Sequence, residues 1–355
     1  MSRVRNLSAA LAAAMFSALF AAVPAGASAG GASRDDVADA LERLGITGTY
    51  DTTDGGALAI TTMLDDRETL FLLGDCDPAS GVCRDIAISA TFDAVAVLAP
   101  EKVLSANGFW PFLKVFTDPD TGLVSAELDQ SLVSGDLDLR LKTLIAVWRD
   151  LAATMAASGP ATTAPVPIGE ETRRTAMAAA LAAARALLDK GAAVPPDHRL
   201  ALVTPDAVAA MFEAAGYPAT LAGNGAGRTI AVTLGEVETT VATGLCSPAI
   251  GHCGALRFLA NASRAGASNE RLNWWNGAEW YVRVRPESGE GPDGSKGPDG
   301  GEGIVFDMEV PVFDGLSPAD LARYIDVWYG EVSYYPEFAA EIVTPGDGAN
   351  PPPAD

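Results

Sequence analysis

Four cysteines are the residues whose type and spacing most readily suggest chemistry. They form two pairs, Cys76 with Cys83 and Cys246 with Cys253, and the same spacing separates the partners in both. Four cysteines permit three connectivities. We predict the two local disulfides, because each pair brackets a turn between adjacent strand-like segments and the chain carries an export signal, described below.

Two other kinds of chemistry are open to these cysteines. A metal site at Cys246, His252 and Cys253 would have a single histidine and two adjacent ligands, and no histidine lies near Cys83. A redox-active pair usually has the shorter C-x-x-C spacing, which accompanies a lowered thiol pKa. We therefore favour structural disulfides, and we expect no metal and no other cofactor.

An aromatic and asparagine-rich motif is the second group of candidate site residues. Its tryptophans could stack on a sugar or a peptide, but aromatic residues beside a strand are more often buried in a core, and we favour the core. Its asparagines are expected to cap or bridge a helix-to-strand turn. The motif comprises Leu272, Asn273, Trp274, Trp275 and Asn276, with Trp280 at the start of a predicted strand over 280–285.

Residues that could support catalysis do not form a distinct cluster. His198 and His252 are the two histidines of the chain, and His198 lies in a predicted linker, which argues against a serine or cysteine triad. Acidic residues are abundant, so the alternative function is a hydrolase that acts on envelope glycans through paired carboxylates. Nothing in the sequence singles out two of these acids. We expect no catalytic residue.

The N-terminus has the pattern of a secretory signal. Arg3 and Arg5 precede an apolar run over 7–23, and Ala27-Ser28-Ala29 provides an A-x-A cleavage site. Polar residues and Pro24 interrupt the run, which argues against a membrane anchor. We expect residues 1–29 to be removed, and the mature protein to be periplasmic or secreted with no stable insertion in the membrane.

The charge of the chain limits its partners. The formal net charge is −22 at pH 7, and removal of Arg3 and Arg5 with the signal would make the chain more negative still. Such a field repels the phosphates of nucleic acids, so we expect no nucleic-acid partner.

Two stretches of the chain repeat one order of predicted elements. Each contains a helix, three strands, a second helix, two strands and a long helix. Trp148 and Trp328 lie at equivalent places on the apolar stripes of the long helices, where we expect both side chains to be buried. Helices and cysteines repeated in one order indicate a duplication. Meandering strands between terminal helices predict an α+β fold with antiparallel sheets.

Composition sets the expected boundaries of the two domains. We expect a signal at 1–29, a first domain at 34–155, a linker with an alanine-rich helix at 156–203, a second domain at 204–343 and a disordered tail at 344–355. Prolines without apolar periodicity mark 159–169 as the linker proper. The glycine- and aspartate-rich stretch 291–300 lacks the regular carboxylate spacing of a calcium loop, and we expect a hairpin tip there.

The second stretch resembles the YbjN domain. The resemblance rests on the motif from Leu272 to Asn276, the segment WYVRV that follows it, the acidic segment 306–310 and the helix that carries Trp328. The first stretch keeps Asn107 but lacks the tryptophans. YbjN domains are similar in fold to type III secretion chaperones, which implies two tandem helix–antiparallel sheet–helix domains. The family is described as regulatory or chaperone-like, which implies an unknown protein partner bound on a sheet face or in a groove.

Overall fold

The computed structural model describes most of both repeated stretches. The described residues are 30–52, 58–92, 100–117, 122–134, 136–159, 169, 172, 200, 203–223, 228–247, 252–263, 268–287 and 303–340. The predicted signal, most of the linker with its alanine-rich helix, the stretch 291–300 and the predicted tail lie outside them. Among the described helices, none is both long and apolar enough to cross a membrane.

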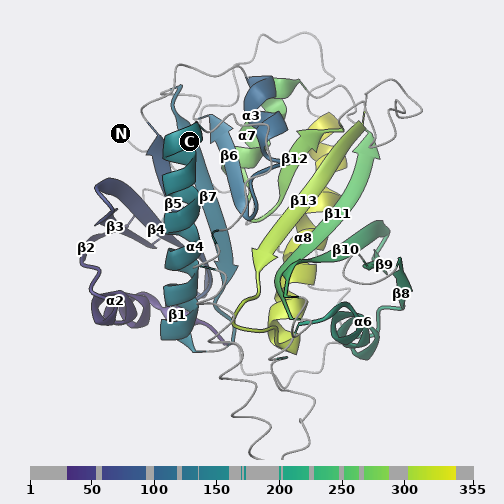
Figure 1. The fold of residues 1–355 in the computed structure, drawn as a ribbon, viewed down its shortest axis with the longest axis horizontal. Helices are drawn as coiled ribbons and strands as arrows, with labels where there is room; N and C mark the ends of the chain where they lie inside the picture. The colour runs from purple at the N-terminus through teal and green to yellow at the C-terminus, as the bar shows by residue number, and fades with distance from the viewer. Residues whose placement is uncertain are drawn as a thin grey trace, which may run out of the picture.

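The first repeat forms an antiparallel sheet with helices at its start and end (Figure 1). The strand order is β2-β3-β4-β5-β7-β6, and the short β1 pairs with β5. The elements are β1 (Ala32–Ser33), α2 (Arg34–Arg43), β2 (Gly48–Thr52), β3 (Leu58–Leu64), β4 (Arg67–Cys76), β5 (Val82–Phe92), α3 (Pro100–Ala106), β6 (Leu113–Thr117), β7 (Val124–Ser131) and α4 (Leu137–Ser158).

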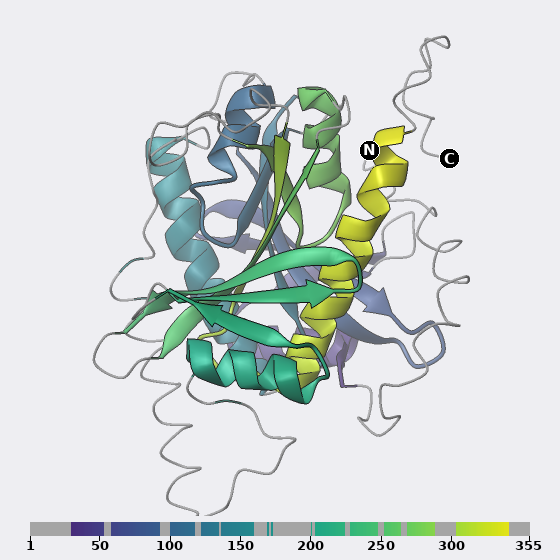
Figure 2. The same ribbon diagram turned by 90° about the vertical axis from the view of Figure 1, so that its right-hand side faces the viewer.

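The second repeat has the same topology, with strand order β12-β13-β11-β10-β9-β8. Figure 2 shows β8, β9 and β10 as a layer beside α6, with the long α8 crossing behind it. The elements are α6 (Pro205–Ala214), β8 (Ala219–Ala222), β9 (Thr229–Leu234), β10 (Val237–Cys246), β11 (Cys253–Ser263), α7 (Asn269–Ala278), β12 (Arg283–Pro286), β13 (Gly303–Pro311) and α8 (Pro318–Ala340).

The predicted α+β class with antiparallel sheets is confirmed, and one detail of the expected order is wrong. The second repeat has four strands before its second helix, and the first has five with the two-residue β1, because β2 and β8 add an edge strand to the expected three. These strands are short and rich in threonine, glycine and alanine, so they lack the apolar alternation that marks a strand in sequence.

Local signals set the start and end of the first helix in each repeat. Ser33 and Asp36 form a reciprocal capping box at the start of α2. At the start of α6, the Thr204 side chain accepts from the backbone of Ala207. Gly45 and Gly216 follow the helix ends with φ of 76° and 90°, a conformation that other residues adopt only at a cost.

Each repeat builds a core between one face of its sheet and its long helix. Trp148 of α4 and Trp328 of α8 are 1% and 0% exposed. The Trp328 ring lies 5.8 Å from the Phe258 ring on β11, and its Nε1 donates to the Thr239 hydroxyl at 2.9 Å. The apolar stripes of the long helices therefore face the sheets.

The opposite faces of the central strands are covered by the other repeat. Every residue of β7 is buried, although a strand with one face in water would alternate between buried and exposed. Leu104 of the first repeat packs in the core of the second, and Ala255 and Phe313 of the second pack in the core of the first. Figure 1 shows the two sheets facing each other, with β6 and β12 at the centre. We call this contact the copy interface.

Candidate functional site

Asparagine side chains of the motif and of its counterpart in the first repeat form hydrogen bonds with strand backbone at the copy interface. Asn107 bonds both the carbonyl (2.9 Å) and the N–H (2.7 Å) of Val115, and Asn276 makes the same two bonds to Val284. Asn273 reaches across the interface, where its amide group bonds the carbonyl and the N–H of Thr117 at 2.8 and 2.9 Å. At Thr117, the last residue of β6, the backbone of this edge strand is thus hydrogen-bonded to a side chain of the second repeat.

The tryptophans of the motif lie in three different environments. Leu272 and Trp275 are fully buried, and the Trp275 ring lies 6.1 Å from Phe306. Trp280 packs on the first repeat, where its ring occupies the space that a side chain on Gly74 would need. Trp274 is 39% exposed.

The strand that follows the motif starts later than predicted. The predicted strand over 280–285 is observed only from Arg283, and its counterpart in the first repeat, β6, starts at Leu113. The preceding residues Phe112 and Tyr281 have φ of 62° and 57°, outside the range of a strand. Each N–H instead donates across the interface, from Phe112 to Glu309 (3.3 Å) and from Tyr281 to Asp129 (3.0 Å).

A buried base of each repeat makes the equivalent contacts. Lys114 on β6 pairs with Glu127 at 2.8 Å and donates to the carbonyl of Glu279 in the second repeat. Arg283 on β12 pairs with Glu309 at 3.3 Å and donates to the carbonyl of Trp110 in the first. Reciprocal contacts of this kind characterise an isologous interface, in which two equivalent surfaces contact each other. Here both surfaces belong to one chain.

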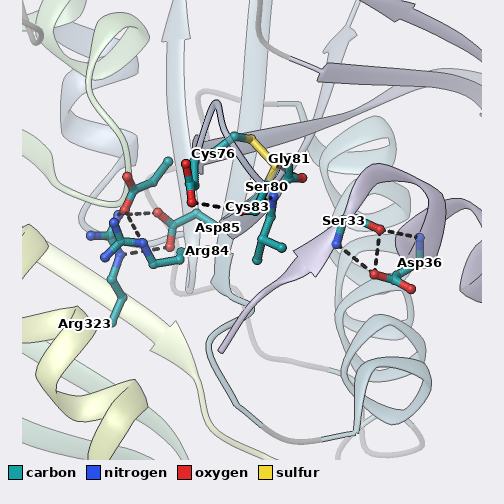
Figure 3. The surroundings of a disulfide bond; sticks show 12 residues. Ser33, Asp36, Cys76, Ser80, Gly81, Cys83, Arg84, Asp85 and Arg323 are labelled. Carbon is teal, nitrogen blue, oxygen red and sulfur yellow. Dashed lines mark hydrogen bonds and ion pairs between the residues drawn. A yellow bond between two sulfur atoms is a disulfide. The ribbon is translucent and has the colours of Figure 1, made fainter. Parts of the chain in front are cut away.

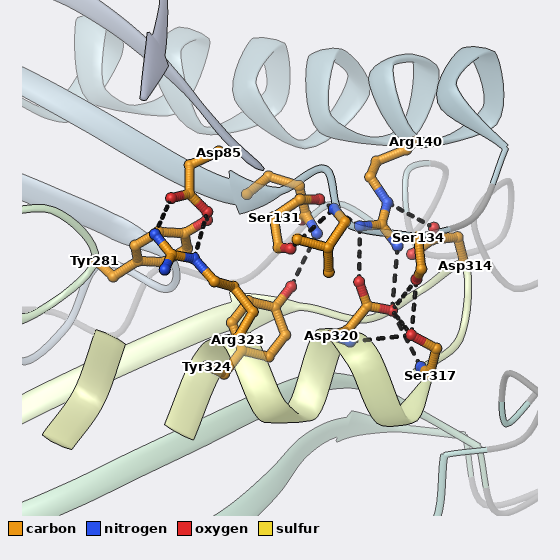
Figure 4. Close-up of polar contacts among 12 residues, drawn as sticks. Asp85, Ser131, Ser134, Arg140, Tyr281, Asp314, Ser317, Asp320, Arg323 and Tyr324 are labelled. Atoms are coloured by element: carbon orange, nitrogen blue, oxygen red, sulfur yellow. Dashed lines mark hydrogen bonds and ion pairs between the residues drawn. The ribbon is translucent and has the colours of Figure 1, made fainter. Parts of the chain in front are cut away.

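The starts of the two long helices meet at a second charged cluster (Figure 4). Arg140 of α4 pairs with Asp320 of α8 at 3.0 Å and with Asp314 at 3.3 Å. Asp320 also accepts from the hydroxyls of Ser134 and Ser317, at 2.6 and 2.7 Å. The guanidinium and both carboxylates are almost completely buried.

A third cluster lies beside the first disulfide (Figure 3). Asp85 on β5 accepts from the Tyr281 hydroxyl at 2.8 Å and from Arg323 of α8 at 3.2 Å. Arg323 also pairs with Asp75 on β4 at 2.9 Å. The disulfide between Cys76 and Cys83 joins β4 to β5 next to both aspartates.

The second cysteine pair closes the matching hairpin of the second repeat. Cys246 and Cys253 are bonded and join β10 to β11, so all four cysteines of the chain are in disulfides. His252 is fully buried, and its Nδ1 accepts from the backbone N–H of Val203 at 2.9 Å. Burial lowers its pKa.

Burial shifts the pKa of several carboxylates in the interface. It raises the pKa of Asp85, Glu309 and Asp314 above the usual range, although each has an arginine partner. Asp307 is also fully buried, but Arg283 and Arg257 outweigh the burial and hold its pKa below the usual value. The interface therefore combines acids whose pKa is raised by burial with an acid whose pKa is lowered by its arginine partners.

The sequence reasoning missed the buried charges, although one signal for them was present. Asp307 and Glu309 alternate with apolar residues along β13, which indicates one polar face. That this face is buried follows only from the packing of the other repeat. The expected exposed sheet face is consequently limited to the outer strands, β2 to β4 and β8 to β10.

Two hollows adjoin the described residues of the first repeat. A small one of about 200 Å³ lies between α2 and α4, and Arg43 and Arg140 are among its lining residues. A groove of about 540 Å³ lies at the free edge of the sheet, where it is lined by residues 45–49 and 61–64 with Glu68 and Arg149. Met63 in this groove is 61% exposed.

Comparison with known proteins agrees with the duplication. No curated protein and no solved structure matches the chain. A family model with the description "putative bacterial sensory transduction regulator" matches residues 33–158 and 204–339, which are the two repeats of the structure. Because these matches span more than half of the chain, the protein belongs to the YbjN family and carries two tandem copies of its domain.

Proposed function

We propose that this chain is an exported, non-enzymatic regulatory protein that binds an extended segment of a protein partner in the groove beside β2. The family description as a sensory transduction regulator supports a regulatory role. The observation that carries the binding proposal is the groove itself, which combines a free sheet edge with an exposed methionine.

The groove has the features that an extended peptide needs. Strand β2 pairs only with β3 among the described strands, so its outer edge offers unpaired backbone groups. A peptide laid along such an edge gains main-chain hydrogen bonds, and its alternate side chains enter neighbouring pockets. Met63, whose flexible side chain adapts to different partners, supplies exposed apolar surface there.

The second copy is built differently at the same place. Thr233 replaces Met63 on the equivalent strand, and Tyr329 replaces Arg149 on the equivalent helix. The Tyr329 ring packs directly against Gly235 in the turn between β9 and β10. The partner site is therefore assigned to the first copy.

The buried acids support a non-enzymatic role over the glycan hydrolase. Asp307 binds Arg257 and Arg283, Glu127 binds Lys114, and Asp85 binds Arg323. A hydrolase needs two carboxylates that face a substrate cleft. Here the paired acids face the other copy.

Two features support export. Residues 1–29 have the composition of a signal, and the structure contains two disulfides, which persist in oxidising compartments. Intact-mass measurement of the native protein, alkylated without reductant, should find no free thiols and a mature N-terminus near Ala29 or Gly30. Four alkylated cysteines would contradict this location.

The partner site is tested by a pull-down from envelope extract with mass-spectrometric identification. We expect the mature protein to retain a specific protein that Met63→Glu loses. Thr233→Glu is the matched control, since it places the same charge at the equivalent exposed position of the second copy, and it should retain that protein. Retention by both variants would place the site elsewhere, and no specific protein on the native chain would contradict partner binding.

A further inference from the structure

The first disulfide lies next to a residue with a rare backbone conformation. Strands β4 and β5 are in register at two neighbouring places, Gly74 with Asp85 and Cys76 with Cys83. The register skips Asp75, which lies between these pairs and has a φ of 48°. A residue other than glycine adopts this conformation only at a cost. The disulfide therefore holds the strand in place directly after the residue at which it leaves the regular ladder.

From this conformation Asp75 contacts the second copy. Its carboxylate pairs with Arg323 of α8 at 2.9 Å and with Arg84 of its own copy at 3.1 Å. Asp85 also binds Arg323, but it is in register with β4 on one side and with Ser131 of β7 on the other. The sheet thus fixes the position of Asp85, whereas the position of Asp75 depends on the disulfide.

The equivalent residue of the second copy also contacts the other copy. Leu245 precedes Cys246, has a φ of 53° and packs against the core of the first copy. The register between β10 and β11 skips Leu245 and resumes at Cys246 with Cys253. Each disulfide thus adjoins a residue that contacts the other copy, by an ion pair in one case and by an apolar contact in the other.

We propose that the disulfide between Cys76 and Cys83 is a site of thiol–disulfide exchange with a dithiol reductant, and that its reduction weakens the copy interface. Cys76 is partly exposed and Cys83 is buried, so a reductant reaches the bond from the side of Cys76. The two thiols of the reductant form a disulfide, the bond between the cysteines breaks, and two protons pass to the cysteine sulfurs. Asp75 is then free to leave its costly conformation, and its ion pair with Arg323 is lost.

Reduction of the full mature chain tests whether the bond opens in the folded protein. Dithiothreitol, at a concentration that leaves the far-UV circular dichroism unchanged, followed by alkylation and peptide mass mapping, should modify Cys76 and Cys83. The amides of Tyr281 and Thr117 donate across the interface, and their hydrogen exchange should then accelerate. We expect an increase of about two- to fivefold, the range for loss of a partly exposed ion pair. Cysteines that stay bonded until the chain unfolds would overturn the proposal.

Variants assign the effect to the ion pair of Asp75. Combined Cys76→Ala and Cys83→Ala should accelerate the same amides without a reductant. In an Asp75→Asn background this pair of substitutions should have no further effect, because asparagine tolerates the left-handed conformation but forms no ion pair. Asp326→Asn is the matched control background, since Asp326 pairs with Arg323 from the same helix at 3.1 Å, and there the acceleration should persist. Equal acceleration in the native and Asp75→Asn backgrounds, or unchanged exchange in the native one, would overturn the proposal.

Discussion

Arg140 and Asp320 occupy equivalent positions in the first turns of α4 and α8, and they form an ion pair with each other across the copy interface at 3.0 Å. A symmetric pair of identical copies would place two like charges at this contact. The duplication has instead diverged to a base in one copy and an acid in the other. The two copies are consequently complementary to each other rather than to themselves.

A double-mutant cycle measures this complementarity. Arg140→Met leaves Asp314 and Asp320 buried without their cation, and we expect a loss of about 3–5 kcal/mol in the free energy of unfolding. Addition of Asp320→Asn should recover part of that loss, so that the coupling exceeds about 1 kcal/mol in urea unfolding.

The control cycle uses an exposed ion pair between two helices of the first copy. Arg43 and Asp138 lie 2.6 Å apart, with 56% and 43% of their side chains exposed. Such exposed pairs contribute little to stability, because water and salt screen the two charges. A coupling at Arg140 and Asp320 no larger than this control would show that their buried pair is not specific.

Trp328 is predicted to stabilise the core of the second copy. Its ring packs on Phe258 and its Nε1 donates to Thr239, so Trp328→Ala removes both a large apolar volume and a hydrogen bond. We expect a loss of about 3–5 kcal/mol in the free energy of unfolding. Trp274→Ala, at a 39% exposed position, should change it by less than about 1 kcal/mol. A melting temperature of Trp328→Ala within a degree of the native chain would contradict this role.

Asn273 is predicted to stabilise the contact between the copies rather than the fold of the second copy, to which it belongs. Asn273→Ala leaves the N–H and the carbonyl of Thr117 without their partners, which should cost about 1–3 kcal/mol. Hydrogen exchange of the Thr117 amide should accelerate, while amides within β10 keep their protection. Asn276→Ala is the comparison variant, because it removes hydrogen bonds to the backbone of Val284 within the same copy. It should leave the exchange of the Thr117 amide unchanged. Unchanged exchange at Thr117 would contradict the role of Asn273.

The features predicted from sequence are those set by local interactions. The two disulfides join cysteines on either side of a tight turn, so their pairing depends on neighbouring residues. The apolar stripes of the long helices and the meandering strands then determine the fold class.

The features that escaped prediction depend on segments far apart in the chain. Lys114 and Arg283 resemble solvent-facing residues of strands, and only the packing of the other copy buries them. Tyr281 was expected inside a strand, but its N–H bonds Asp129 of the first copy, and the backbone leaves the strand conformation to reach it. A hydrophobic pattern records which face of a strand is polar and not which partner covers it.

The association of the two copies through the copy interface is tested most directly by cleavage of the chain between them. We predict that limited proteolysis cleaves first within 159–169, which is proline-rich and lacks the pattern of a helix or strand. Because the copies bury reciprocal charges, the two fragments should elute together from a native size-exclusion column at the position of the uncut protein. They should separate in urea, and the C-terminal fragment should refold alone after its removal. Two separate peaks from the nicked protein under native conditions would contradict the copy interface.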